Sequence, residues 1–223
     1  DVHTVGWLLA LEAIAGEALL EVLGPGRAAI GPGVSGPGEL ELGAGMRPRT
    51  FERSRADGQR TAVERFAGVR PSAVASLGAA GSPRDLLLVA DAGAGPAWLE
   101  AYDHLLGGWW RTVERYRRSG VPPQVVVICA DAARAQARAV RADALLTAAI
   151  AEVGVDPRRW RRGGREGIHF VAEEDLHRGD PSSLQVPSLP PSLREGGGCE
   201  PLRAAFAQLP AGPAGDSAKP PWR

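Results

Sequence analysis

The sequence predicts an α/β fold in which a mixed β-sheet is flanked by helices. Two apolar runs of strand length, at residues 86–90 and 125–130, alternate with segments whose apolar residues recur at helical spacing. Strands that alternate with helices favour a parallel or mixed sheet covered by helices. With 223 residues and 44% hydrophobic residues, the chain is long enough to bury the core of such a domain.

Four strands are expected in this sheet. The strongest is the segment QVVVICA at residues 124–130, because a continuous β-branched run is typical of a strand buried on both faces. The expected sheet is built from residues 69–77, 86–91, 125–130 and 168–172.

Three helices are expected around the sheet. The first follows Thr4 as its N-cap, carries apolar residues at helical spacing from Trp7 to Val22, and stops at Gly24-Pro25. The second spans residues 98–118 and is weakened at Gly107-Gly108. The third is capped by Asp131 and runs to about residue 153.

The composition divides the chain into two parts. Residues 1–180 form the predicted α/β domain, and residues 181–223 are rich in Pro, Gly and Ser and form a mostly disordered tail. Residue 1 is Asp, which leaves open whether an upstream domain precedes this segment.

Composition also excludes several classes of protein. No apolar run reaches the roughly 18 residues of a membrane span, so no membrane association is expected. The two cysteines, Cys129 and Cys199, do not make a disulfide framework, which fits a cytoplasmic protein. Cys129 lies within an apolar strand and is expected to be an inert, buried thiol.

Asp91 is the best candidate for metal chemistry. The four histidines are scattered, and no C-x-x-C or G-x-S-x-G motif occurs. Asp91 ends an apolar strand, where a carboxylate emerges at the edge of a sheet as a magnesium ligand would. The alternative is a turn residue, because Asp-Ala-Gly is ordinary turn chemistry.

Arginine clusters are the candidates for nucleic-acid contact, although the net charge is zero. Five arginines surround Trp160 in the segment PRRWRRGGR, where guanidinium groups would bind phosphates and the indole would stack on an unpaired base. These residues are Arg158, Arg159, Arg161, Arg162 and Arg165. Arg134, Arg138 and Arg141 share one helix face. The alternative for the loop is a solvated surface.

Several short motifs follow one another between residues 3 and 175. They are His3-Thr4-Val5 with Ala10-Leu11-Glu12, residues 69–73 (VRPSA), residues 88–93 (LVADAG), residues 112–116 (TVERY), and strand 125–130 followed by Asp131 and Arg134. This ordered set resembles the core of replication-relaxation proteins, a family of actinobacterial plasmids and integrated mobile elements. Members of that family often carry an upstream winged-helix segment.

The resemblance implies a restriction-endonuclease-like, or PD-(D/E)XK, core. In that fold an Asp on one strand and an Asp or Glu on the next hold magnesium, while a nearby Lys helps to position or activate the attacking water. Asp91, Gly93 and Tyr116 match the family pattern, but other residues replace its Asp, Glu, Arg and Lys: Ser72, Val89, Ala92 and Thr112. The resemblance therefore implies a degenerate catalytic site at Ser72, Asp91 and Thr112.

We therefore expect a DNA-associated protein of plasmid or mobile-element replication or relaxation, which binds the DNA backbone and whose nuclease site is inactive. DNA is the expected partner, together with other replication or transfer proteins. No cofactor is expected, and magnesium only if the site is active. Two alternatives stay open: a magnesium-dependent nuclease or nickase, in which Glu100 or Asp103 assists Asp91, and a protein-interaction module without DNA contact.

Overall fold

A five-stranded mixed sheet forms the centre of the protein, which confirms the predicted α/β class. In the computed structural model, the described residues are 2–30, 51–54, 60–64, 68–78, 84–91, 96–107, 109–152, 167–174, 185–187 and 199–201. The strands follow the order β1-β4-β5-β6-β7 and comprise Leu19–Leu23, Ala73–Leu77, Arg84–Ala90, Gln124–Cys129 and Ile168–Ala172.

The direction of the strands changes once across the sheet. β1, β4 and β5 pair antiparallel, whereas β6 and β7 lie parallel to β5. Parallel neighbours need long crossover connections, and helices supply both of them here. As a result, the carboxyl ends of β5, β6 and β7 meet at one edge of the sheet.

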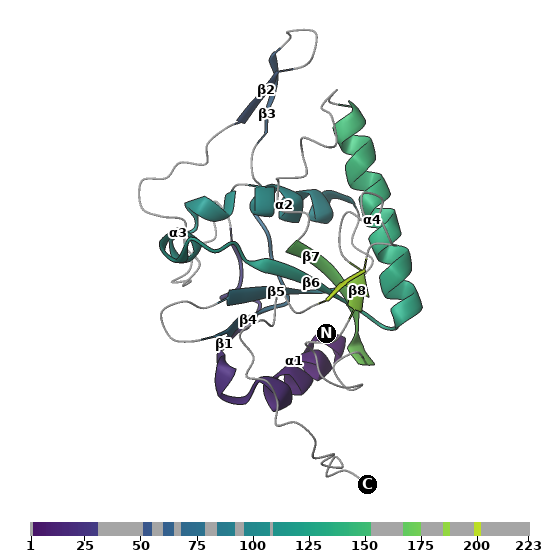
Figure 1. The fold of residues 1–223 in the computed structure, drawn as a ribbon. Helices are drawn as coiled ribbons and strands as arrows, with labels where there is room; N and C mark the ends of the chain where they lie inside the picture. Colours follow the sequence, from purple (N-terminus) through teal and green to yellow (C-terminus); the bar gives the residue numbers. More distant parts are fainter. Residues whose placement is uncertain are drawn as a thin grey trace.

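Helices cover both faces of the sheet, with α1 on one face and α2 and α3 on the other (Figure 1). The helical elements are α1 (Val2–Ala15), α2 (Pro96–Gly107), η2 (Trp109–Thr112), α3 (Glu114–Ser119) and α4 (Ala132–Glu152). α4 buries Ala135, Ala139 and Ala142 in the same core as α2. The arrangement therefore has two hydrophobic layers separated by the sheet.

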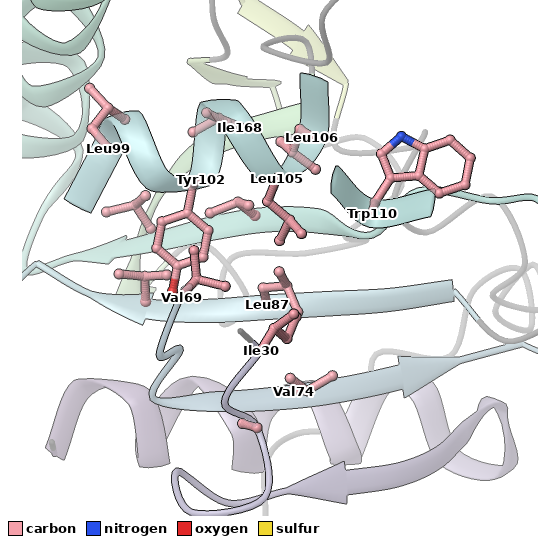
Figure 2. Close-up of a cluster of buried hydrophobic side chains, with 14 of the residues drawn as sticks. Ile30, Val69, Val74, Leu87, Leu99, Tyr102, Leu105, Leu106, Trp110 and Ile168 are labelled. Atoms are coloured by element: carbon pink, nitrogen blue, oxygen red, sulfur yellow. The ribbon is translucent and has the colours of Figure 1, made fainter. Parts of the chain in front are cut away.

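Each layer is built from alternate residues of the same strands. On one face, Trp7 and Leu11 of α1 pack on Leu86 and Leu88 of β5. On the other face, Tyr102 and Leu105 extend from α2 toward the sheet, where Leu87 and Val74 lie (Figure 2). Because β5 and β6 contribute to both layers, their apolar runs are continuous, as the sequence predicts.

The first predicted helix is too long, since α1 ends at Ala15 and residues 19–23 form the edge strand β1. Gly16 has a φ of +49°, a conformation that favours glycine and ends the helix. Pairing with β4 then overrides the helical spacing of the residues that follow. The predicted N-cap is also wrong, because Thr4 is buried inside α1.

The next two predictions need smaller corrections. The predicted strand at residues 69–77 begins only at Ala73, and Val69 forms an isolated antiparallel bridge with Ile30. The predicted helix at residues 98–118 is interrupted after Gly107 and continues as η2 and α3. The interruption falls at the two glycines that weaken the sequence there.

Two small antiparallel ladders complete the described structure. β2 (Phe51–Ser54) pairs with β3 (Arg60–Glu64), which was not predicted. β8 (Gln185–Pro187) pairs with β9 (Cys199–Pro201) within the predicted tail, and β8 contacts β7 and α4. The other residues of the tail lie outside the described residues.

Candidate functional site at the carboxyl edge of the sheet

Asp91 lies at the carboxyl edge of the parallel strands, directly after β5. Its backbone N–H donates a hydrogen bond to the carbonyl of Ile128 on β6, at 3.0 Å. Its side chain is only 6% exposed. The edge formed by the carboxyl ends of parallel strands is where open α/β sheets bind ligands, so this position suits a functional residue.

The carboxylate of Asp91 is paired with two arginines of α4. Nε of Arg134 lies 2.8 Å from Oδ2, and Nε of Arg138 lies 2.9 Å from Oδ1. Both guanidinium groups donate a hydrogen bond to Oδ2, at 2.8 Å from Arg134 and 3.2 Å from Arg138, and Oδ1 takes part in the ion pair with Arg138. Spacing of four residues on a helix places the two arginines on the same face, which lets them converge on one acid.

Asp131 fixes the start of α4 beside Asp91. Its side-chain oxygen accepts a hydrogen bond from the backbone N–H of Arg134 at 2.7 Å, as an N-cap residue does. Its carbonyl accepts from the N–H of Ala135 at 3.0 Å. The predicted capping role of Asp131 is confirmed, and it holds the first turn of α4 where Arg134 reaches Asp91.

Ser72, the first degenerate position, lies at the same edge. Its backbone N–H donates to the carbonyl of Leu88 at 2.7 Å, and its hydroxyl accepts from the N–H of Ala90 at 3.3 Å. β4 runs antiparallel to β5, so the residue before β4 comes next to the end of β5. The structure thus brings Ser72, Asp91, Arg134 and Arg138 together.

Thr112, the second degenerate position, lies elsewhere. Its hydroxyl donates to the carbonyl of Trp109 at 2.6 Å within η2. Arg115, three residues later, contacts Asp85 near the start of β5, at the end of the strand opposite to Asp91. Thr112 therefore does not join Asp91 at the carboxyl edge.

The residues around Asp91 do not fit a magnesium site. A third cation would meet two guanidinium groups that already lie within 2.9 Å of the carboxylate oxygens. Within the described part of the chain, no three His, Cys, Asp or Glu side chains gather in a way that could hold a metal ion. Glu100 and Asp103 both belong to α2, where Glu100 is exposed and Asp103 is buried. Neither of them forms such a group with Asp91.

The predicted DNA-binding loop cannot be placed at this edge. Arg158, Arg159, Trp160, Arg161, Arg162 and Arg165 lie outside the described residues. On α4, Arg134 and Arg138 are 51% and 26% exposed at the side chain, and Arg141 is exposed one turn further along. The described cations of the predicted interface are therefore those of α4.

Cys129, which ends β6, is fully buried. The pKa of its thiol is raised to about 12, mainly by burial and also by the nearby Asp91 carboxylate, while Arg138 and Arg134 act in the opposite direction. A thiol with that pKa is protonated at neutral pH and is a poor nucleophile.

A second polar cluster, which was not predicted from the sequence, lies at the opposite end of β5. Arg115 of α3 reaches Asp85 with Nε at 2.9 Å from Oδ2, and its Nη2 donates to Oδ1 at 3.0 Å. The same Nη2 lies 2.7 Å from Oγ of Ser76, which itself donates to Asp85 at 2.8 Å. Nη1 donates to Glu21 of β1 at 3.2 Å.

This cluster is a buried network that attaches α3 to three strands. Asp85 and Ser76 are 2% and 0% exposed. Burial raises the pKa of the Asp85 carboxyl, and Arg115, Ser76 and Tyr116 lower it only in part. Burial lowers the pKa of the Arg115 guanidinium, but Asp85, Glu21 and Tyr116 outweigh it and the net pKa is raised. In the sequence, the cluster is indicated only by two polar residues, Ser76 and Asp85, that lie next to apolar runs of β4 and β5.

No family model, no curated protein and no solved structure matches this chain. In the parts of the chain that the structure describes, no helix has both the length and the apolar character needed to cross a membrane.

Proposed function

We propose that this chain is a DNA-associated protein of plasmid or mobile-element replication or relaxation. It binds the DNA backbone through arginines and has a nuclease-like site that does not hydrolyse DNA. The observation that carries this proposal is the pairing of both Asp91 oxygens with Arg134 and Arg138. A carboxylate engaged in this way holds the two arginines in place and is not free to hold magnesium.

The arrangement of the sheet supports a restriction-endonuclease-like core. In such a core, the metal-binding acids lie on neighbouring strands. Here Ser72, just before β4, bonds to Ala90 at the end of β5, next to Asp91. At these positions, however, a hydroxyl stands in place of the first carboxylate, and guanidinium groups surround the second. If the core is of this kind, a hydroxyl and a paired carboxylate stand where its metal-binding acids would be.

The charge on α4 supports contact with the DNA backbone. Arg134, Arg138 and Arg141 follow one another along the same face of the helix. Guanidinium groups bind phosphates and release counterions, and this produces affinity with little dependence on sequence. The contact is proposed to extend to Arg158, Arg159, Arg161 and Arg162, which follow α4 in the sequence and lie outside the described residues.

The test measures DNA binding and DNA cleavage with the same purified protein. Fluorescence anisotropy with a labelled duplex should show affinity that falls steeply with salt, and supercoiled plasmid should stay intact in magnesium. Replacing Arg158, Arg159, Arg161 and Arg162 together by Ala should flatten the salt slope by roughly 0.9 per lost phosphate contact. Binding that is absent at low salt would refute the DNA-binding role.

Cleavage provides the second arm of this test. If the plasmid is nicked in magnesium and the Asp91→Asn variant loses that activity, the site is an active nuclease and the non-hydrolytic proposal is wrong. A variant with Glu114→Gln, a change on the surface of α3 away from Asp91, serves as the control for unspecific loss of activity.

A further inference from the structure

We propose that Asp91 is a positioning residue that sets Arg134 and Arg138 as a two-guanidinium clamp for one phosphate group. The ligand class is a phosphate oxyanion, supplied either by a nucleic-acid backbone or as a free phosphate. This inference rests on the proposed function and deepens it, because it assigns one binding site to the carboxyl edge of the sheet.

Asp91 contacts both arginines through their Nε atoms, so the N–H groups on the Nη atoms remain as donors for a ligand. Each guanidinium is held through its Nε, at 2.8 Å for Arg134 and 2.9 Å for Arg138. The Nη atoms carry the remaining N–H groups of each planar fork. The side chain of Arg134 is half-exposed and that of Arg138 partly so, while Asp91 is almost buried, so the arginine side chains are more open to solvent than the carboxylate.

Two cations converge on the single carboxylate of Asp91, so these three side chains together carry a net charge of +1. The carboxylate of Asp131 lies next to them and accepts from the backbone N–H of Arg134. Among the described residues, Asp91 is the one acid whose side chain pairs with either guanidinium. A phosphodiester carries a single negative charge and would neutralise the group.

Fixing the arginines in advance is what distinguishes a clamp from a charged surface. A free arginine loses rotamer entropy when it binds, whereas one already held by a carboxylate has lost part of it. The fork of a guanidinium also matches two oxygens of a phosphate, which an ammonium does not. Removal of Asp91 should therefore weaken phosphate binding even though it makes the protein more positive.

The first experiment separates fork geometry from charge. Arg134→Lys/Arg138→Lys keeps both charges but cannot form the Nε contacts to Asp91. Its affinity for a labelled duplex at fixed salt should fall at least about tenfold. The matched control is Arg117→Lys/Arg118→Lys, whose arginines pair with Glu114 on the surface of α3. The control should bind like the original protein. Equal binding and equal salt slopes for the two double variants would overturn the clamp.

The second experiment tests the positioning role of Asp91. Asp91→Asn should bind the duplex more weakly than the original protein, with a thermal midpoint measured in parallel to verify folding. A purely electrostatic surface gives the opposite result, tighter binding, because one negative charge is removed. Tighter or unchanged binding by a folded Asp91→Asn protein would overturn the positioning role.

Free phosphate separates this inference from the proposed function. Inorganic phosphate should bind the original protein in a calorimetric titration and should fail to bind Arg134→Lys/Arg138→Lys. If the protein binds phosphate in this way but not DNA, the DNA role is wrong and the clamp stands. If it binds DNA while both double variants behave alike, the DNA role stands and the clamp is wrong.

Discussion

Asp85 and Arg115 face each other inside the protein, with Nε of the guanidinium 2.9 Å from Oδ2 of the carboxylate. The two residues belong to β5 and α3 and are separated by 30 positions in the sequence. Ser76 and Glu21 complete the network, so one arginine connects α3 to three neighbouring strands of the sheet. This contact makes α3 part of the folded core rather than a surface turn.

The first prediction concerns the loss of this arginine. Arg115→Met should lower the free energy of unfolding by about 3–5 kcal/mol, because it leaves a buried carboxylate without its cation. Urea unfolding followed by circular dichroism measures the change. Arg117→Met, which removes an arginine of the same helix from a surface pair, should leave the free energy nearly unchanged. Equal effects of the two substitutions would show that the buried network contributes nothing.

The second prediction concerns pH. The pKa of Asp85 is raised in the folded protein, so the folded state binds its proton more readily than the unfolded chain does. The contribution of Asp85 to stability is therefore largest below its unfolded pKa and is lost as the pH rises through the folded pKa. Compared with Asp85→Asn, the original protein should gain stability as the pH falls from 7 to about 4.

Urea unfolding of both proteins at several pH values in this range gives the required difference. A difference that becomes less favourable to the original protein on acidification would mean that Arg115 outweighs burial and holds the carboxyl ionised.

The third prediction concerns the start of α4. Asp131→Ala should cost about 1 kcal/mol of unfolding free energy, since it removes the acceptor for the N–H of Arg134. Asp131→Asn keeps a good capping oxygen and should cost much less. Thermal or urea unfolding of the two variants compares them directly, and an equally large loss in both would point to the charge of Asp131 rather than to its capping bond.

The fourth prediction concerns Cys129. With its thiol fully buried and its pKa raised to about 12, Cys129 should not react with a maleimide at neutral pH while the protein is folded. The measurement uses the Cys199→Ser variant, so that Cys129 is the sole thiol, and follows labelling by mass spectrometry with and without urea. Rapid labelling without urea would show that the end of β6 opens in the folded state.

The apolar strands of this fold are predictable from sequence, and its edge strand is not. β5 and β6 are buried on both faces, so both strands carry an uninterrupted apolar run, at residues 86–90 and 125–129. The apolar residues of β1 continue the helical spacing of α1. They form a strand because their backbone pairs with that of β4. Such pairing depends on residues far away in the sequence, so the local pattern of apolar residues does not predict it.

The candidate site was predictable to a similar extent. Asp91 follows an apolar strand, and the spacing of Arg134 and Arg138 places them on one helix face. Their contact with Asp91 depends on where the helix begins after β6, which the spacing alone does not determine. The partnership of Asp85 with Arg115 had even less local signal, because the strand and α3 meet only after the crossover between β5 and β6 has formed.

Ser76 and Asp85 stand directly opposite each other on β4 and β5, and this determines how the two strands align. β4 consists of small and apolar residues, so a slip by two positions would leave every side chain on its own face of the sheet. Such a slip would set the carboxylate of Asp85 opposite Val74 or Gly78, without a hydroxyl to donate to it. The polar pair thereby selects one alignment among several that the hydrophobic pattern treats as equivalent.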